Sequence, residues 1–300
     1  MAAAATTPPV LTGERPVEEI VVPVGDGPLP VRALELAAAL AGRWGLPVRL
    51  LHATGHDPVV ATDPELAAAR TSLADRAPDL DVRVEALAGD DPAAAVAAIV
   101  DATALTVVAT EQADAWSFKH SVAETLVDRL RGPLVLVGPS ARPPSLDGAD
   151  VVAALDGSGA GQAALSASAA LARSLGGTLR LLRVVPEPTP GAPADTADAD
   201  RSDAGRPDNG VADELRHLAD RIEPPVAVTW EIVHGNDPIG AIETVADGTG
   251  AEFVVVASRG RTDETRTTMA STTMGLVARA ERPVLVVHAD RRRQDPPADR

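Results

Sequence analysis

The segment "ASRGRTDETRTTMAST", Ala257 to Thr272, carries residue types that suit a phosphate site. It lies between the apolar run "FVVV" and a helix-like segment, so its end offers the free N–H groups and the positive dipole of a helix N-terminus to an anion. Ser271 and Thr272 add hydroxyl groups, and arginines outnumber acidic residues. However, Gly260 is its one glycine, where phosphate loops usually hold several. The alternative is a solvated surface loop.

A carboxylate is the second candidate. Asp156 lies in "LDGSGAGQAAL", directly after an apolar strand-like run. A dinucleotide fingerprint is disfavoured, because Gln162 stands at its third glycine and Arg183 ends the next strand where an acidic residue would bind the ribose. Asp156 can instead accept hydrogen bonds from a ribose hydroxyl or an adenine amine. The structural alternative is that Asp156 caps the following helix.

The elements that position these residues are written twice in the chain. "PLVLVGP" from Pro133 returns as "PVLVVHA" from Pro283, "GDDPAAAVAAI" from Gly89 returns as "GNDPIGAIETV", and "VRLLH" returns as "LRLLR". The second copy has an extra segment, Pro186 to Gly210, rich in Pro, Gly, Ala, Ser and Asp, which we predict to be a mobile loop. Pro and Gly near residues 138–150 indicate a domain boundary.

Short β-branched runs alternate with helical patterns in the second half. The predicted strands are Val151–Leu155, Leu179–Val185, Val226–Val233, Phe253–Val256 and Val284–Val287. The predicted helices are Ala160–Leu175, Val211–Ile222, Pro238–Ala246 and Ser271–Ala280. Asp237 is a predicted N-cap before Pro238, and Asp91 repeats this before Pro92. The alternation predicts an α/β fold with a doubly wound, parallel five-stranded sheet in each half.

These motifs resemble the universal stress protein family, over about residues 17–289. ATP-binding members carry V-D-G-S after strand one and G-x2-G-x9-G-[S/T] after strand four; here strand one is followed by "LDGS", residues 155–158. The second motif reads A-x2-G-x9-A-S, with its positions at Ala257, Gly260, Ala270 and Ser271. The spacing is kept, but two of the three motif glycines are alanine, which is strained wherever the backbone needs φ > 0.

The resemblance implies ATP, with Mg²⁺, as the ligand of the second half. Asp156 would contact the adenosine and Val184 would lie beside the base. The residues around the phosphates would be Ala257, Gly260, Ala270, Ser271 and Thr272. The sequence leaves open whether the alanines abolish binding, in which case the chain is an interaction module with vestigial sites.

The resemblance also implies two domains of the Rossmann-like, adenine-nucleotide-hydrolase-like type, at residues 17–138 and 150–289. Their final strands, Leu134–Val137 and Leu285–Val287, would pair so that the halves form a pseudo-dimer, and the sequence leaves open whether whole chains also form a homodimer. The first site is eroded: Gly25 replaces the aspartate, and Asp26 follows one residue late. The next loop, Ala109 to Ser121, has no glycine and holds two aromatic residues, Trp116 and Phe118, which either occupy the nucleotide space or anchor the loop.

Composition narrows the function further. The chain has no cysteine and a formal net charge of −16, which fits a cytoplasmic protein and disfavours nucleic acid or anionic membranes as partners. No catalytic constellation or compelling metal pattern is present. The sequence thus favours a stress-response binding protein over an enzyme, with weak ATP hydrolysis or autophosphorylation left open.

Overall fold

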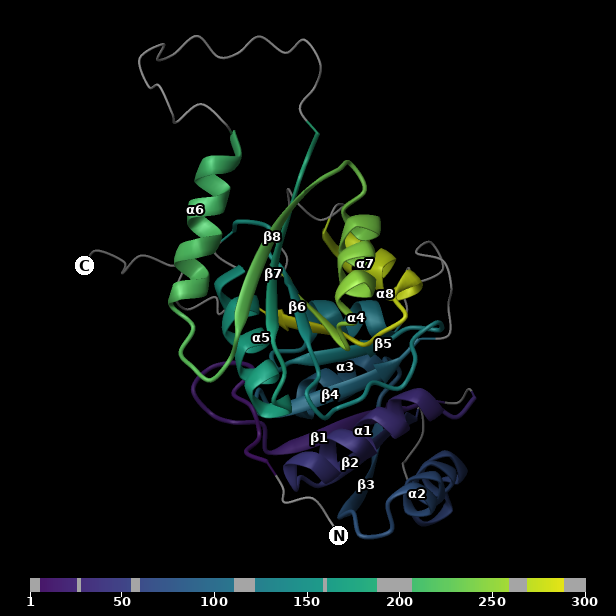
Figure 1. Ribbon diagram of the computed structural model, residues 1–300. Coiled ribbons are helices and arrows are strands. Elements are labelled where there is room, and N and C mark those ends of the chain that lie inside the picture. The colour runs from purple at the N-terminus through teal and green to yellow at the C-terminus, as the bar shows by residue number, and fades with distance from the viewer. Residues whose placement is uncertain are drawn as a thin grey trace, which may run out of the picture.

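The computed structural model describes residues 6–25, 28–54, 60–110, 122–158, 161–187, 207–258 and 269–288. Helices and strands alternate within each half (Figure 1). The first half contains β1 (Glu19–Val24), α1 (Val31–Trp44), β2 (Val48–Thr54), the short 3-10 helix η1 (Val60–Thr62), α2 (Pro64–Arg76), β3 (Val82–Ala88), α3 (Pro92–Ile99), β4 (Ala104–Ala109), α4 (Val122–Arg129) and β5 (Leu134–Val137). The second half contains β6 (Val151–Ala154), α5 (Gly161–Leu175), β7 (Leu179–Val185), α6 (Pro207–Asp220), β8 (Val228–His234), α7 (Pro238–Thr249), β9 (Phe253–Ser258), α8 (Met269–Arg279) and β10 (Val284–His288).

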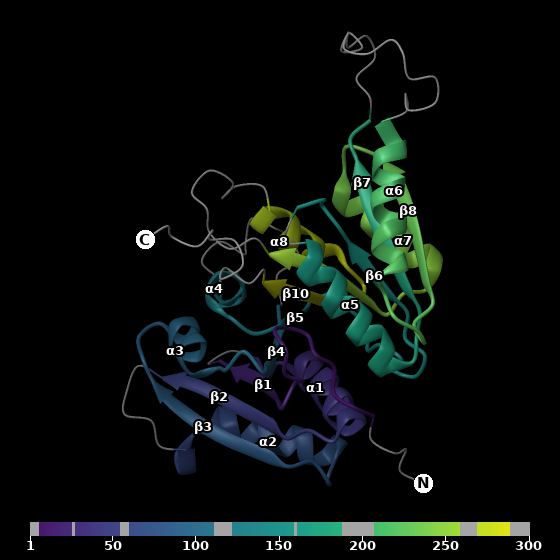
Figure 2. The same cartoon turned by 90° about the vertical axis from the view of Figure 1, so that its left-hand side faces the viewer.

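The strands form one ten-stranded sheet in the order β3-β2-β1-β4-β5-β10-β9-β6-β7-β8. Within each half all neighbouring strands are parallel, and the two halves have the same strand order when each is read from its third strand. The halves join where β5 and β10 pair antiparallel, with Leu285 opposite Val135 (Figure 2). The predicted α/β fold with a mostly parallel sheet and the pairing of the final strands are confirmed, and this pairing joins the five strands of each half into one sheet.

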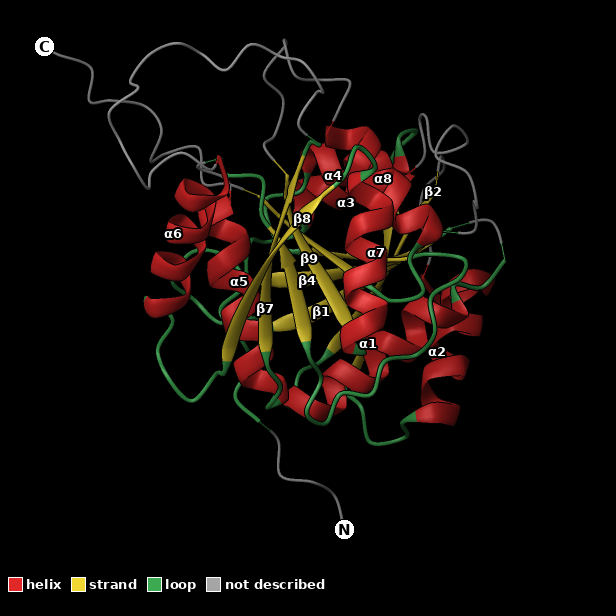
Figure 3. Cartoon of the chain, turned by 45° about the horizontal axis from the view of Figure 1, so that its top comes forward, coloured by secondary structure: helices red, strands yellow, loops and turns green. Residues whose placement is uncertain are grey.

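The helices cover the sheet in two layers (Figure 3). One hydrophobic core contains buried residues of α1, α2, α5 and α6, and the other contains residues of α3, α4, α7 and α8. Successive strand residues alternate between the two cores: Ile20 and Val22 belong to the first, and Val21 to the second. Both faces of the sheet are therefore buried, which explains why its central strands are continuous apolar runs.

Two helix starts follow the predicted capping pattern. The carboxylate of Asp91 accepts a hydrogen bond from the Ala94 N–H at 3.1 Å, and Asp237 accepts one from the Gly240 N–H at the same distance. Proline occupies the first turn of α3 and of α7, where its missing N–H needs no partner. These local predictions are confirmed.

Several element boundaries differ from prediction by a few residues, and two helix starts bear on the site. Helix α8 starts at Met269, two residues before the predicted Ser271. Helix α6 starts at Pro207, so the prediction of a mobile loop is wrong for residues 207–210. The φ angle that proline fixes suits a first helical turn, and Leu215 anchors the helix in the core. Residues 188–206 of that predicted loop lie outside the described residues.

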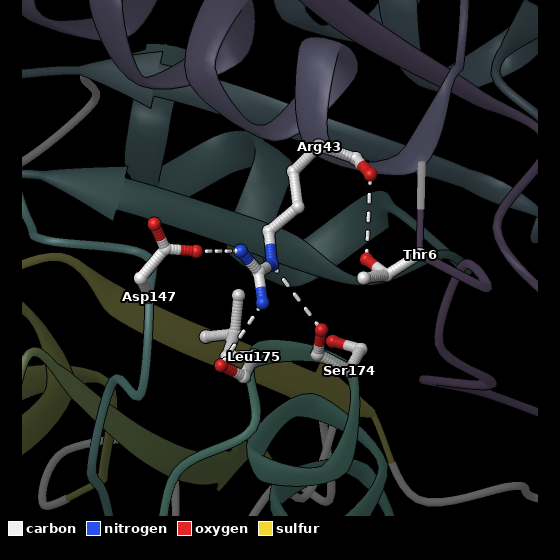
Figure 4. A network of polar contacts seen from close by, with 5 residues as sticks. All are labelled: Thr6, Arg43, Asp147, Ser174 and Leu175. Atoms are coloured by element: carbon white, nitrogen blue, oxygen red, sulfur yellow. Dashed lines mark hydrogen bonds and ion pairs between the residues drawn. The ribbon is translucent and has the colours of Figure 1, made fainter. Parts of the chain in front are cut away.

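Polar contacts also cross between the halves, and Figure 4 shows the main group. Arg43, in the last turn of α1, forms an ion pair with Asp147. Its Nη2 donates to the Leu175 carbonyl at 3.0 Å and its Nε to the Ser174 carbonyl at 3.3 Å. The guanidinium of one half therefore caps the C-terminal end of α5 in the other half. None of the described helices is long and apolar enough to span a membrane.

Candidate functional site

Three parallel strands of the second half end at the same edge of the sheet. The central strand β6 pairs with β7 on one side and with β9 on the other, so Ala154 lies beside Leu182 and Val256. Asp156 follows two residues beyond β6. The strand order reverses between β6 and β9, which makes this edge the topological switch point, where sheets of this kind bind ligands.

Asp156 is exposed and closes the turn that leads into α5. Its Oδ1 accepts hydrogen bonds from the Ser158 N–H at 2.9 Å and from the Ser158 hydroxyl at 2.6 Å. The Ser158 carbonyl in turn accepts from the N–H of Gly161, the first residue of α5, at 2.9 Å. The carboxylate is thus held in an Asx turn ahead of the helix, and these bonds keep it at the strand edge.

The two predicted side chains beside this turn lie on opposite faces of the sheet. Val184, near the end of β7, is half-buried against the core of α7 and α8. Ala257, in β9, is 7% exposed and belongs to the core of α5 and α6. The methyl group of Ala257 is therefore packed in the interior. Val184 and Ala257 flank the strand that carries Asp156.

Neither motif alanine has a backbone that needs glycine in this structure. Ala257 is an ordinary strand residue, paired with Val287 of the parallel neighbour β10. Ala270 lies in the first turn of α8, which starts at Met269. Regular strands and right-handed helices both have φ < 0, where alanine is unstrained. The backbone strain that the sequence left open as a possibility is therefore absent at Ala257 and at Ala270.

The first turn of α8 brings three of the predicted phosphate residues together. Ala270, Ser271 and Thr272 are consecutive helical residues at the end of α8 that offers free N–H groups. Helix α8 rests on α7 through Gly275, where an added Cβ would lie 2.6 Å from Cδ1 of Ile239. Gly260 lies outside the described residues.

Ion pairs hold these two helices together as well. Arg279 of α8 bonds the N-cap residue of α7, Asp237, at 3.5 Å and Glu243 within α7 at 3.0 Å. Burial raises the pKa of Glu243, against the lowering effect of Arg279. The first half repeats the contact, since Arg129 of α4 bonds Asp91 of α3 at 3.1 Å. The orientation of α8 is therefore fixed by contacts that the repeat preserves.

Arg183 is a residue of this site that the sequence interpretation missed. Its side chain is buried, and its Nη2 donates to Oε2 of Glu214 on α6 at 2.7 Å. A Cβ added to Gly157 would lie 2.1 Å from Arg183 Nη1, so the guanidinium lies directly against Gly157. The available signal was its position in the strand. Because strand residues alternate between faces, Arg183 lies on the same buried face of β7 as Leu179 and Leu181, where an apolar side chain is expected.

The first half has a different arrangement at the equivalent strand end. His52, which matches Arg183 in the repeat, is 3% exposed, and its Nδ1 lies 2.7 Å from Oδ2 of Asp63. Asp63 is also the N-cap of α2 and accepts from the Leu66 N–H. Although burial alone would raise the pKa of Asp63, this N–H and His52 hold it below its usual value. Asp26, Trp116 and Phe118 lie outside the described residues, and a Cβ added to Gly25 would meet no atom of the described residues within 4 Å.

Comparisons with known proteins agree with this fold. Residues 149–288 match the model of the universal stress protein family. A universal stress protein from Archaeoglobus fulgidus DSM 4304 superposes with a TM-score of 0.64 at 17% identity, over 91% of this chain and 97% of that one. One from Pseudomonas aeruginosa UCBPP-PA14, described as a putative universal stress protein, gives 0.60 at 17% identity, over 91% and 93%. A universal stress protein solved in complex with cAMP gives 0.34 at 21% identity, over 47% and 98%. Curated proteins gave no match.

Proposed function

We propose that the second half, whose residues 149–288 match the model of the universal stress protein family, binds an adenine nucleotide, with ATP and Mg²⁺ as the ligand to test. The chain then acts as a regulatory binding protein of two domains, at about residues 17–138 and 150–289. Ligand occupancy biases whichever conformation holds the nucleotide better. No catalytic step is part of this proposal.

The observation that carries the proposal is the turn of Asp156 at the switch point of the sheet. A fixed carboxylate suits the hydroxyl groups of a ribose or the amine of adenine, and it repels phosphate. The adenosine therefore belongs at Asp156, beside Val184 of β7. The phosphates belong beyond β9, where the first turn of α8 offers N–H groups. This placement of the adenosine and the phosphates is the one that the family resemblance of the sequence motifs implies.

The two alanines are compatible with that ligand. Ala257 buries its methyl group in the core, and Ala270 lies in a helix, so neither substitution forces the backbone out of shape. Glycine at these positions should therefore change nucleotide affinity little. Equal affinities of the wild-type protein and of the Ala257→Gly and Ala270→Gly variants for ATP would support this view, and a gain of tenfold or more in either variant would contradict it.

The test of the proposed function uses the intact chain. Boiling the purified protein and identifying the released small molecules shows whether a nucleotide co-purifies, and titration calorimetry with ATP and Mg²⁺ gives the affinity. Asp156→Ala should lower ATP affinity by about tenfold or more, since a hydrogen bond to a charged group is worth about 1.5–3 kcal/mol. Glu252→Ala, which removes a carboxylate at the opposite end of β9, is the matched control and should have no effect.

The second candidate is an interaction module that binds no nucleotide. The observation in its favour is that Arg183 fills space beside Gly157 with protein atoms. A protein without released nucleotide, and without a thermal shift at millimolar ATP, would select this candidate over the first.

A further inference from the structure

The side chain of Arg183 connects the turn of Asp156 to helix α6. On one side it bonds Glu214 of α6 at 2.7 Å. On the other its guanidinium lies where a side chain of Gly157 would project, 2.1 to 2.8 Å from the ideal Cβ position. Gly157 also has φ of +76°, which favours glycine for a second reason. One residue after Asp156, the backbone is therefore shaped to receive this guanidinium.

Packing alone does not explain an arginine at this position. Arg183 is 8% exposed and lies on the face of β7 that buries Leu179 and Leu181. A buried ion pair is weak evidence for stability, because apolar residues of similar volume often serve as well. In addition, Nε of Arg183 is buried and has no hydrogen-bond partner among the residues that the structure describes, which is unfavourable. The fold thus tolerates a charged group here that it does not require.

The same strand offers a comparison within the molecule. Arg180, three residues earlier on β7, bonds Glu231 of β8 at 3.1 Å. Its side chain is 32% exposed against 10% for Arg183, and it lies on the other face of the sheet. Arg180 therefore has the same chemistry and a similar ion pair, without contact to the turn.

We propose that Arg183 is a positioning residue for the nucleotide site: anchored by Glu214, it holds the turn at residues 156–158 and so directs the carboxylate of Asp156. This inference rests on the proposed function. Beyond the proposed function, it states that selectivity for the adenosine part of the ligand depends on the side chain of Arg183, which lies against the turn. It also connects the site to α6, because the anchor Glu214 belongs to that helix.

A positioning role predicts a particular pattern of ligand affinities. If Asp156 reads the ribose hydroxyl and the adenine amine, the wild-type protein prefers ATP over 2′-deoxy-ATP and over GTP. Loss of Arg183 should reduce that preference, because the carboxylate is no longer held in place. Affinity for inorganic tripolyphosphate should stay unchanged, since the first turn of α8 is untouched. A merely destabilised protein would instead weaken all ligands in parallel.

The variants to compare are Arg183→Met and Glu214→Gln, with Arg180→Met as the matched control. Titration calorimetry should show ATP affinity falling about tenfold in Arg183→Met, with the preference over 2′-deoxy-ATP and GTP reduced to below about threefold. Glu214→Gln should give a smaller change in the same direction, and it keeps the arginine in place if Arg183→Met folds poorly. Arg180→Met should match the wild type.

Hydrogen exchange of the ligand-free protein tests the contact separately. Peptides that cover residues 155–165 should exchange faster in Arg183→Met than in the wild type or in Arg180→Met. Unchanged exchange, or an unchanged preference among the three nucleotides, would overturn the positioning role even if ATP binds. A wild-type protein that binds no nucleotide would overturn the proposed function, and with it the role of Arg183 in selectivity, whatever the exchange data show about the turn.

Discussion

Replacing Gly157 by alanine tests the geometry of the turn without any ligand. The backbone of Gly157 has φ of +76°, and an added Cβ would lie 2.1 Å from Arg183 Nη1. Left-handed backbone costs a residue with a side chain about 1–2 kcal/mol, and the reduced freedom of the unfolded chain returns about 0.4–1 kcal/mol. The net cost of strain is therefore roughly 1 kcal/mol.

The contact with Arg183 adds a second cost. The guanidinium is the flexible end of a side chain, so it can move, but it is nearly buried and bonded to Glu214. Moving it sacrifices that bond, for which we take about 1–2 kcal/mol because Glu214 is partly exposed. The free energy of unfolding should then fall by about 2–3 kcal/mol in Gly157→Ala.

A matched glycine separates the two costs. Gly176 follows α5 with φ of +73°, and an added Cβ there would meet nothing within 4 Å. Gly176→Ala should therefore cost about 1 kcal/mol, from strain alone. Gly157→Ala introduced into an Arg183→Ala protein should cost about the same, because the obstructing guanidinium is gone.

Urea unfolding followed by circular dichroism gives the four free energies of the Gly157–Arg183 cycle. The expected coupling is about 1–2 kcal/mol. A Gly157→Ala protein as stable as the wild type would refute the geometry of the turn. Equal costs of Gly157→Ala with and without Arg183 would show that the guanidinium does not lie on Gly157, and the positioning role would lose its basis.

Three further predictions concern contacts away from the turn. Arg43→Met should lower the free energy of unfolding by about 2 kcal/mol and separate the unfolding of the two halves, because it removes the hydrogen bonds to the Leu175 and Ser174 carbonyls. The control Arg173→Met loses a hydrogen bond to the Glu223 carbonyl within one half and should not separate the two unfolding transitions. Asp63→Asn should be less stable than the wild type at neutral pH, and the difference in stability should disappear as the pH falls below 3.8. The reason is that a carboxyl group with a lowered pKa stabilises the fold while it is ionised, and this stabilisation is lost when the group is protonated. A difference in urea midpoints that does not change with pH would contradict this. The raised pKa of Glu243 has the opposite sign, so its contribution to stability falls as the pH rises above 4.5, and Glu243→Gln should flatten that part of the stability–pH profile.

The sequence predicted the fold well because the signals for it are local and repeated. Alternating apolar runs and helical patterns, with Asp–Pro at two helix starts, were enough to predict the parallel sheet in each half. The pairing of β5 with β10 was predicted from the family resemblance. The start of α6 was predicted wrongly because the amino-acid composition of the preceding segment was given more weight than the position of Pro207. Pro207 was counted among the residues that disfavour order, although a proline in the first turn favours a helix.

The site was only partly predictable, because its main features depend on contacts between distant residues. Asp156 could be selected from its place after β6, but the two bonds that hold it come from the geometry of the turn. The contact of Arg183 with Gly157 joins two strands and a helix, and the pattern "LRLLR" by itself indicated only an unusual charge in a buried run. At the level of sequence, Arg183 served only to argue against a dinucleotide site, and so its contact with Gly157 was missed.

The motif alanines show why a glycine count is a weak guide to this kind of site. A glycine is required where the backbone has φ > 0 or where another group approaches closely. Ala257 lies in a regular strand and Ala270 in a helix, so neither backbone needs φ > 0, whereas Gly157 has a positive φ and also lies against Arg183. The glycine on which the site depends is therefore in the turn of Asp156, and not among the positions of the loop that have changed. If nucleotide binding has been lost from this chain, the cause should be sought at Arg183 and Gly157 before the two alanines are blamed.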